Sequence, residues 1–174
     1  AHTASTLGDL VQHMEGIPDD DKTKVWDLID AWAARETDEK AKAALRETIR
    51  RFAFTRRGRR RGLTIATADR ARKASAALAP QDSVVRHAWL FAKDWVEESA
   101  EEFAAEDFDF TKREERIDAA RRSAISEIWA DRGFDGIKAL LTDSEAPFTV
   151  GRYAAAVASD VAAAVGFTLS CLVL

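Results

Sequence analysis

Apolar residues recur at helical spacing along almost the whole chain, from Leu7 to Leu174, and this periodicity constrains the fold more than any other feature. Each apolar stripe is narrow, so the helix that carries it is stable only when a neighbouring helix covers that side. Glycine and proline, which a strand-rich fold needs for its turns, number only 8 and 3 among 174 residues. The sequence therefore predicts an all-α fold.

The pattern divides into about seven to nine helices with short connections, which is typical of an irregular helical bundle or a short α-solenoid. Several helix ends carry recognisable signals. Asp82 or Ser83 is expected to cap a helix that runs to Ala92. Thr111 begins a Thr-Lys-Arg-Glu capping box, and Gly133 is expected to end that helix with a left-handed backbone.

The sharpest change in composition is the run Arg56-Arg57-Gly58-Arg59-Arg60-Arg61-Gly62. We interpret residues 1–174 as a single helical domain in which this run forms a basic loop between sub-units 1–55 and 67–174. The chain has no initiator methionine and ends on the apolar sequence GFTLSCLVL. We therefore expect it to be a fragment of a longer polypeptide.

The basic loop is the strongest candidate for a functional site. Residues 46–73 contain eleven basic and two acidic side chains, a local charge of +9 in a chain whose net charge is −4. Such a field attracts phosphates or an acidic protein surface. The candidate binding residues are Arg56, Arg57, Arg59, Arg60 and Arg61.

A block of eight acids without any lysine or arginine spans Asp94–Asp109. Three hypotheses for the basic loop stay open: it pairs with this block or is simply solvated, it binds a protein partner, or it binds nucleic acid or phosphate. Nucleic acid ranks below a protein because the whole chain is acidic. A cation site is not expected in the block, because it lacks the central glycine and alternating ligands of a calcium loop.

No sequence motif for catalysis is present. The chain contains no nucleophile-elbow, dinucleotide-binding or phosphate-loop motif. Its three histidines, His2, His13 and His87, are too scattered to indicate a metal site. We expect no enzyme activity, no cofactor and no metal. The alternative is an enzyme whose carboxylates meet only in three dimensions, recognisable by acids with raised pKa values.

Other features suggest location and assembly. A single cysteine, Cys171, fits a reducing cytoplasm, and the opening sequence lacks a signal peptide. The five tryptophans are expected mainly in the core, with Trp95 the most exposed. Residues 161–174 are nearly all apolar but too few for the roughly 20 residues that cross a bilayer. We expect a buried terminal helix, which in an isolated fragment could drive homo-oligomerisation.

The chain resembles helical-repeat regions of large multidomain bacterial proteins. The resemblance rests on Arg86-His87-Ala88-Trp89-Leu90-Phe91, on Lys112-Arg113-Glu114-Glu115-Arg116-Ile117 and on Ile128-Trp129. In such proteins a helical array commonly adjoins a separate catalytic or nucleotide-binding module, so the resemblance implies a sensing or docking role. It covers about half of the chain.

Together these observations predict a non-enzymatic helical scaffold or protein-interaction module of a larger cytoplasmic protein. Its partner is expected to be another protein or an adjacent domain of the same polypeptide. The alternative is a regulatory domain that binds nucleic acid or phosphate through Arg56–Arg61.

Overall fold

The computed structural model describes residues 18–55, 64–93, 96–105 and 109–172, and these residues form seven α-helices and no strand. The predicted all-α fold is confirmed for this part of the chain. The helix expected near Leu7 lies outside the described residues. The helices are α2 (Asp19–Ala33), α3 (Glu39–Arg50), α5 (Ile65–Ala77), α6 (Ser83–Ala92), α7 (Ala100–Ala104), α8 (Phe110–Asp143) and α9 (Pro147–Leu172).

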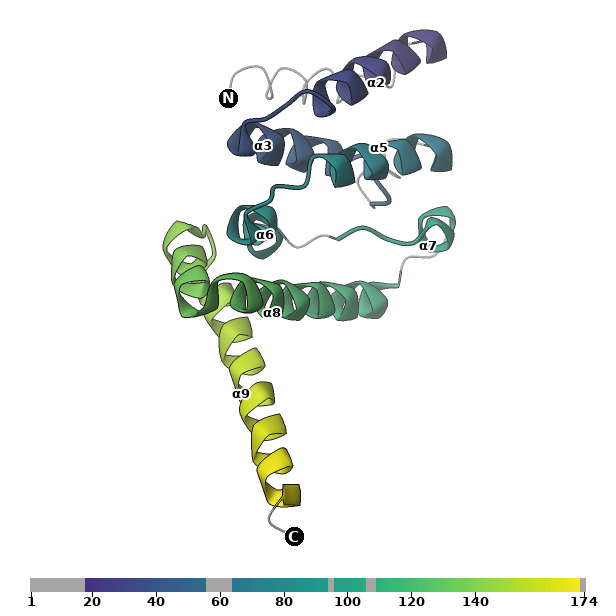
Figure 1. Cartoon of the computed structure of the whole chain (residues 1–174). Helices are drawn as coiled ribbons and strands as arrows, with labels where there is room; N and C mark the ends of the chain where they lie inside the picture. The colour runs from purple at the N-terminus through teal and green to yellow at the C-terminus, as the bar shows by residue number, and fades with distance from the viewer. Residues whose placement is uncertain (1–17, 56–63, 94–95, 106–108, 173–174) are drawn as a thin grey trace.

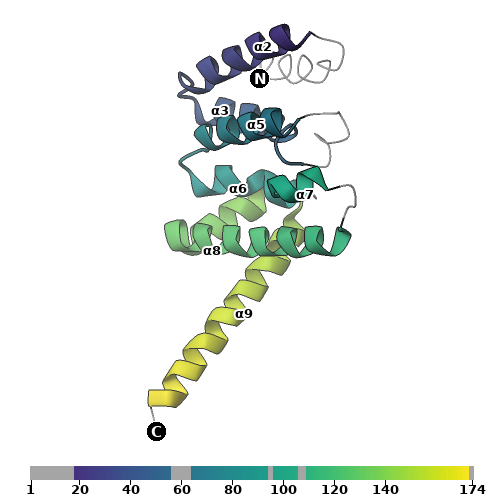
Figure 2. The same ribbon diagram turned by 90° about the vertical axis from the view of Figure 1, so that its right-hand side faces the viewer.

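The helices lie in layers that follow the order of the chain (Figure 1, Figure 2). α2 forms one end of the stack, α3 and α5 lie next to it, α6 and α7 follow, and α8 forms the far layer. α3 packs on α5 and α6, while α8 packs on α6 and α9. Each helix therefore covers its apolar stripe mainly with helices that are close to it in sequence.

Two large apolar clusters hold the layers together. The first joins α2, α3 and α5 and consists of Trp26, Ile29, Leu45, Ile49, Phe52, Ala53, Ala71, Ala74 and Leu78. The second joins α6, α8 and α9 and consists of Val84, Leu90, Phe91, Val96, Ile117, Ala124, Ile125, Ile128, Ile137, Leu140, Val150 and Tyr153. Because α5 belongs to the first cluster, the division between the two clusters falls between α5 and α6.

Two helix starts show how well side-chain caps can be read from sequence. Asp82 caps α6 as predicted, since its side chain accepts hydrogen bonds from the backbone N–H groups of Val84 and Val85. The capping box predicted at Thr111 is wrong: α8 begins at Phe110, and the Asp109 side chain accepts the backbone N–H of Lys112 at 3.0 Å. Aspartate is the stronger N-cap, so the earlier residue takes this role.

The acidic segment contains the short helix α7. α7 begins with a complete capping box, in which Ser99 Oγ accepts the backbone N–H of Glu102 and the Glu102 carboxylate accepts that of Ser99. Phe103 is buried, and its ring centroid lies 5.6 Å from that of Phe54. This aromatic contact ties the acidic segment to the stack.

α8 is divided by a kink at Gly133, where φ is 58° and ψ is −145°. This conformation is open almost exclusively to glycine, so the predicted positive φ is confirmed. Gly136 is buried just after the kink, and a Cβ added there would lie 2.8 Å from Ile128 Cγ2 and 2.8 Å from Arg132 Cβ. The two glycines together permit the tight elbow between residues 110–132 and 134–143.

α9 begins at Pro147, whose missing N–H is not needed in the first turn of a helix. Val150 and Tyr153 are buried against the second cluster, but the helix then extends away from the layers (Figure 1, Figure 2). The prediction of a buried terminal helix concerns residues 161–174, whose side chains lie outside the described ones except for Val161, which is 56% exposed. No described helix combines the length and the apolar character needed to cross a bilayer.

Candidate functional site

The five arginines of the predicted basic loop lie outside the described residues, so their role stays a prediction. Those residues are Arg56, Arg57, Arg59, Arg60 and Arg61. Basic side chains near the loop in sequence are engaged within the fold. Arg70 pairs with Asp27 at 2.5 Å and with Asp30 at 2.7 Å, and Arg51 lies 3.4 Å from Glu47. The fold therefore neutralises part of the positive charge of residues 46–73.

The described part of the acidic block also pairs with arginines outside the loop. Glu97 lies 3.2 Å from Arg50 Nε on α3, and Glu102 pairs with Arg116 on α8. Asp94, Glu106 and Asp107 lie outside the described residues. Within the described ranges, no group of three or more His, Cys, Asp or Glu side chains is placed to hold a metal ion. Glu97 and Glu102 are thus occupied by other partners than the predicted loop.

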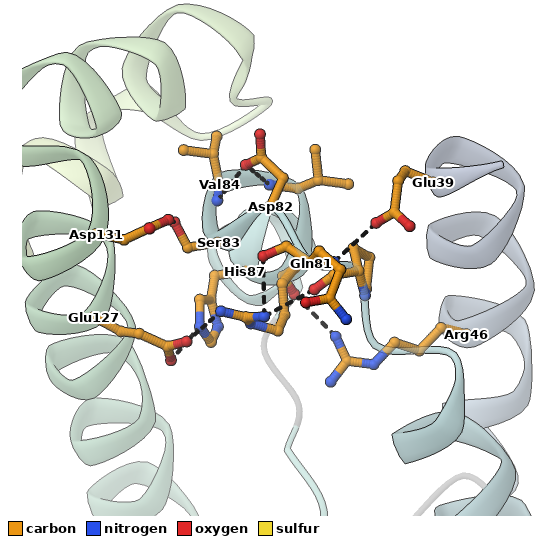
Figure 3. Close-up of polar contacts among 12 residues, drawn as sticks. Glu39, Arg46, Gln81, Asp82, Ser83, Val84, His87, Glu127 and Asp131 are labelled. Carbon is orange, nitrogen blue, oxygen red and sulfur yellow. Dashed lines mark hydrogen bonds and ion pairs between the residues drawn. The ribbon is translucent and has the colours of Figure 1, made fainter. Parts of the chain in front are cut away.

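A polar layer on α6 connects the two halves of the stack (Figure 3). On the side of α8, Ser83 Oγ donates to Asp131 Oδ2 at 2.6 Å, and His87 Nε2 lies 2.8 Å from Glu127 Oε2. Ser83 and His87 are four positions apart on α6, and Glu127 and Asp131 are four positions apart on α8, so each pair lies on one face of its helix. We call these two contacts the α6–α8 ladder.

The opposite side of α6 is tied to α3. Glu39 accepts the backbone N–H of Gln81 at 2.8 Å, and Arg46 Nη1 donates to the carbonyl of Arg86 at 3.2 Å (Figure 3). Arg86 itself donates to the carbonyl of Pro80 at 2.8 Å. These bonds satisfy backbone groups at the start of α6 and fix its position against α3.

The α6–α8 ladder contains the residue types of a hydrolase but not the required arrangement. The Ser83 hydroxyl is fully buried and donates to Asp131 rather than to a general base. His87 Nε2 is directed at Glu127. A catalytic serine must be exposed and bonded to its base. The ladder therefore positions helices, and it offers no accessible nucleophile.

Burial sets the protonation state of the histidine in the ladder. Desolvation lowers the pKa of His87 below its usual 6.5 and outweighs the opposing hydrogen bond and charge of Glu127. The bond from His87 in turn lowers the pKa of the Glu127 carboxyl. The lowered pKa of His87 and the lowered pKa of Glu127 both fit a neutral imidazole that donates its Nε2–H to an ionised carboxylate.

A cleft of about 430 Å³ lies between α3 and α6, beside the polar layer. Trp89 and several small apolar side chains form part of its walls. Its charged lining consists of the basic residues Lys40, Arg46, Arg86 and Lys93 and the acidic residues Glu47, Asp143 and Glu145. A volume of this size is in the range of ligand-binding clefts.

Two arginines on α3 lie close to the cleft: Arg46 lines it, and Arg50 stacks on Trp89, which also lines it. The Arg50 guanidinium lies 3.7 Å from the centroid of the Trp89 ring, and burial lowers the pKa of Arg50 to about 10. Burial also lowers the pKa of Arg46, whose Nε is buried and has no hydrogen-bond partner among the described residues. Both arginines interact with the same acid, Glu97. A partly buried guanidinium with an unused donor therefore borders the cleft.

A second hollow, of about 530 Å³, lies between the elbow of α8 and α9. We call it the α8–α9 groove. Its lining contains one polar residue and consists of Ile125, Ser126, Trp129, Phe134, Ile137, Ala154, Val157, Ala158 and Val161. Trp129 is 53% exposed and Phe134 is 67% exposed. The expectation that Trp129 is a core residue is wrong, because Ile125 and Ile128 form the buried side of the helix and Trp129 lies beyond it.

Neither the cleft nor the groove is recognisable from the sequence alone. Arg46 counted only as part of the local charge, although its position beside the buried Leu45 and one turn from Arg50 is a usable signal. The groove depends on the elbow at Gly133, whose angle no periodicity encodes.

The chain matches no family model, no curated protein and no solved structure.

Proposed function

We propose that this chain is a non-enzymatic helical scaffold of the short α-solenoid type, which binds an acidic segment of a protein partner in the α3–α6 cleft. The observation that carries the proposal is the guanidinium of Arg46, a residue that lines a cleft also lined by Trp89. A carboxylate accepts such a donor in a charge-assisted bond, and its apolar neighbour can pack on an aromatic ring.

The charges of the cleft favour an anionic ligand. Its lining contains four basic and three acidic side chains. Two of the acids and two of the basic residues already have partners, since Glu47 pairs with Arg51, Arg86 pairs with Glu127, and Lys93 lies 4.0 Å from Glu145. The basic residues Lys40 and Arg46 and the acid Asp143 are the other charged residues of the lining. A carboxylate bound near Arg46 would accept hydrogen bonds from the guanidinium and so replace the bonds to water that it lost on burial.

The partner in this proposal is a separate protein or an adjacent domain of the same polypeptide, in the bacterial cytoplasm. The layered stack supports it, because an array in which each helix contacts its neighbours presents long surfaces between layers. The docking role implied by the resemblance to helical-repeat regions points in the same direction.

The test is an NMR titration of the full chain with a short peptide in which glutamate alternates with leucine. We expect saturable shifts of the Arg46 Nε–H and Trp89 indole signals, which Arg46→Met abolishes. Arg35→Met is the matched control, because Arg35 is an exposed arginine in the turn after α2 and does not line the cleft. A peptide with lysine in place of glutamate should cause no such shifts. Equal shifts with both peptides, or unchanged binding by Arg46→Met, contradict the proposal.

One observation favours a second function, the binding of nucleic acid or phosphate by Arg56–Arg61. Glu97 and Glu102, two acids that could neutralise the loop, pair with Arg50 and Arg116 instead. Changing Arg59, Arg60 and Arg61 to alanine tests it. Loss of nucleic-acid affinity with an unchanged melting temperature supports this function, and unchanged affinity removes it. Genuine phosphate contacts also weaken steeply as salt increases.

A further inference from the structure

The α3–α6 cleft is lined by an acidic segment of the chain itself. This segment connects α8 to α9 and consists of Asp143, Ser144 and Glu145, which we call the acidic turn. Lys93, the residue that follows α6, also lines the cleft, and its Nζ lies 4.0 Å from Glu145 Oε2. A basic side chain of the cleft therefore already has a carboxylate of the same protein beside it.

The backbone of the acidic turn is held in place on both sides. Leu140 in the last turn of α8 and Val150 in the first turn of α9 are fully buried in the second apolar cluster. Between them, Ser144 Oγ accepts the backbone N–H of Ala146 at 2.9 Å, and Pro147 restricts the backbone where α9 begins. A ligand in the cleft could therefore displace the side chains of the turn but not its backbone.

The contact between Glu145 and Lys93 is weak enough for a ligand to replace it. The Glu145 side chain is 79% exposed and the Lys93 side chain is 39% exposed. Exposed ion pairs contribute little to stability, because water screens the charges and both side chains lose entropy when they pair. A carboxylate of a bound peptide offers Lys93 the same interaction, so it competes directly with Glu145.

We propose that the acidic turn is an internal competitor that limits the affinity of the α3–α6 cleft for acidic ligands, and that a carboxylate of the partner displaces Glu145 from Lys93. This inference rests on the function proposed above for the cleft. A segment with one acid gains little at Lys93, because it only replaces Glu145. A segment with several acids also reaches Lys40 and Arg46, so the cleft should select strongly acidic segments.

The titration with the glutamate–leucine peptide tests the competitor when it is repeated on Glu145→Gln. We expect this variant to bind the peptide about two- to fivefold more tightly than the unsubstituted chain, the range expected for one exposed charge pair. Glu115→Gln is the matched control, because Glu115 is an exposed glutamate of α8 that does not line the cleft. It removes the same charge and should leave the affinity unchanged.

A double variant separates displacement from general repulsion. Glu145→Gln should raise the affinity less in a Lys93→Met background, because no ammonium group is then released for the ligand. An equal gain in both backgrounds, an equal gain with Glu115→Gln, or no gain with Glu145→Gln overturns the inference and leaves the cleft as a binding site. If neither the unsubstituted chain nor Glu145→Gln binds the peptide, the proposed function itself is overturned.

Discussion

The kink in α8 predicts how a substitution at Gly133 changes stability. Gly133→Ala adds a Cβ at φ 58° and ψ −145°, although no atom lies within 4 Å of the added group. The space is open, so any destabilisation must come from the backbone conformation and not from a clash. Gly151 in α9 also has nothing within 4 Å of an added Cβ, but it lies inside an ordinary helix.

Gly133→Ala and Gly151→Ala are expected to change the free energy of unfolding in opposite directions. A non-glycine residue in such a conformation costs about 1–3 kcal/mol, of which the lower entropy of the unfolded chain returns about 0.4–1 kcal/mol. Gly133→Ala should therefore lower the free energy of unfolding by about 1–2 kcal/mol, or the melting temperature by about 2–8 °C. Gly151→Ala should raise the free energy by about 0.5–1 kcal/mol, because alanine is the better helix former.

Urea unfolding followed by circular dichroism measures both variants on the same scale. Gly136→Ala shows the effect of a steric clash without a positive φ. Its Cβ would lie 2.8 Å from atoms of Ile128 and Arg132, so the substitution should lower the free energy of unfolding by about 1–3 kcal/mol through overpacking. Equal shifts of Gly133→Ala and Gly151→Ala, in the same direction, would refute the role assigned to the positive φ.

Three further predictions concern caps and protonation. Asp109→Ala should lower the free energy of unfolding by about 1 kcal/mol in thermal or urea unfolding, whereas Thr111→Ala should change it by less than about 0.5 kcal/mol, because only Asp109 caps α8. His87, with its lowered pKa, stabilises the fold fully above pH 6.5, and this contribution should be lost as the pH falls from 6.5 through the folded-state pKa. His87→Gln should flatten this part of the stability profile, and an unchanged profile would contradict the neutral ring. Glu127 has a lowered pKa too, so Glu127→Gln should remove a loss of stability that begins below pH 4.5.

The helices were largely predictable because their signals are local. Apolar spacing and the cap at Asp82 depend on residues within one or two turns, and α6 begins as expected. Thr111 shows the limit of such signals. Asp109 and Thr111 are both good N-caps two residues apart, and the choice between them depends on where the preceding chain arrives.

The candidate sites were not predictable in the same way. The α3–α6 cleft is lined by both Arg46 and Trp89, which are 43 positions apart in sequence, and only the packing of the layers brings both residues to one cleft. Trp129 is apolar and lies next to Ile128, so its sequence looks like core. Its ring is nevertheless 53% exposed, because Ile125 and Ile128 form the buried side of the helix.

The polar layer on α6 has a consequence for how the chain loses its structure. Its contacts with α3, between Glu39 and Gln81 and between Arg46 and Arg86, lie between the two apolar clusters, so one cluster can unfold without exposing the interior of the other. In such a linear array, opening begins at an end and advances one interface at a time. Amide protons of α9 and the second part of α8 should therefore exchange with solvent deuterium well before those of α3 and α5, and proteases should trim the chain from its carboxyl end.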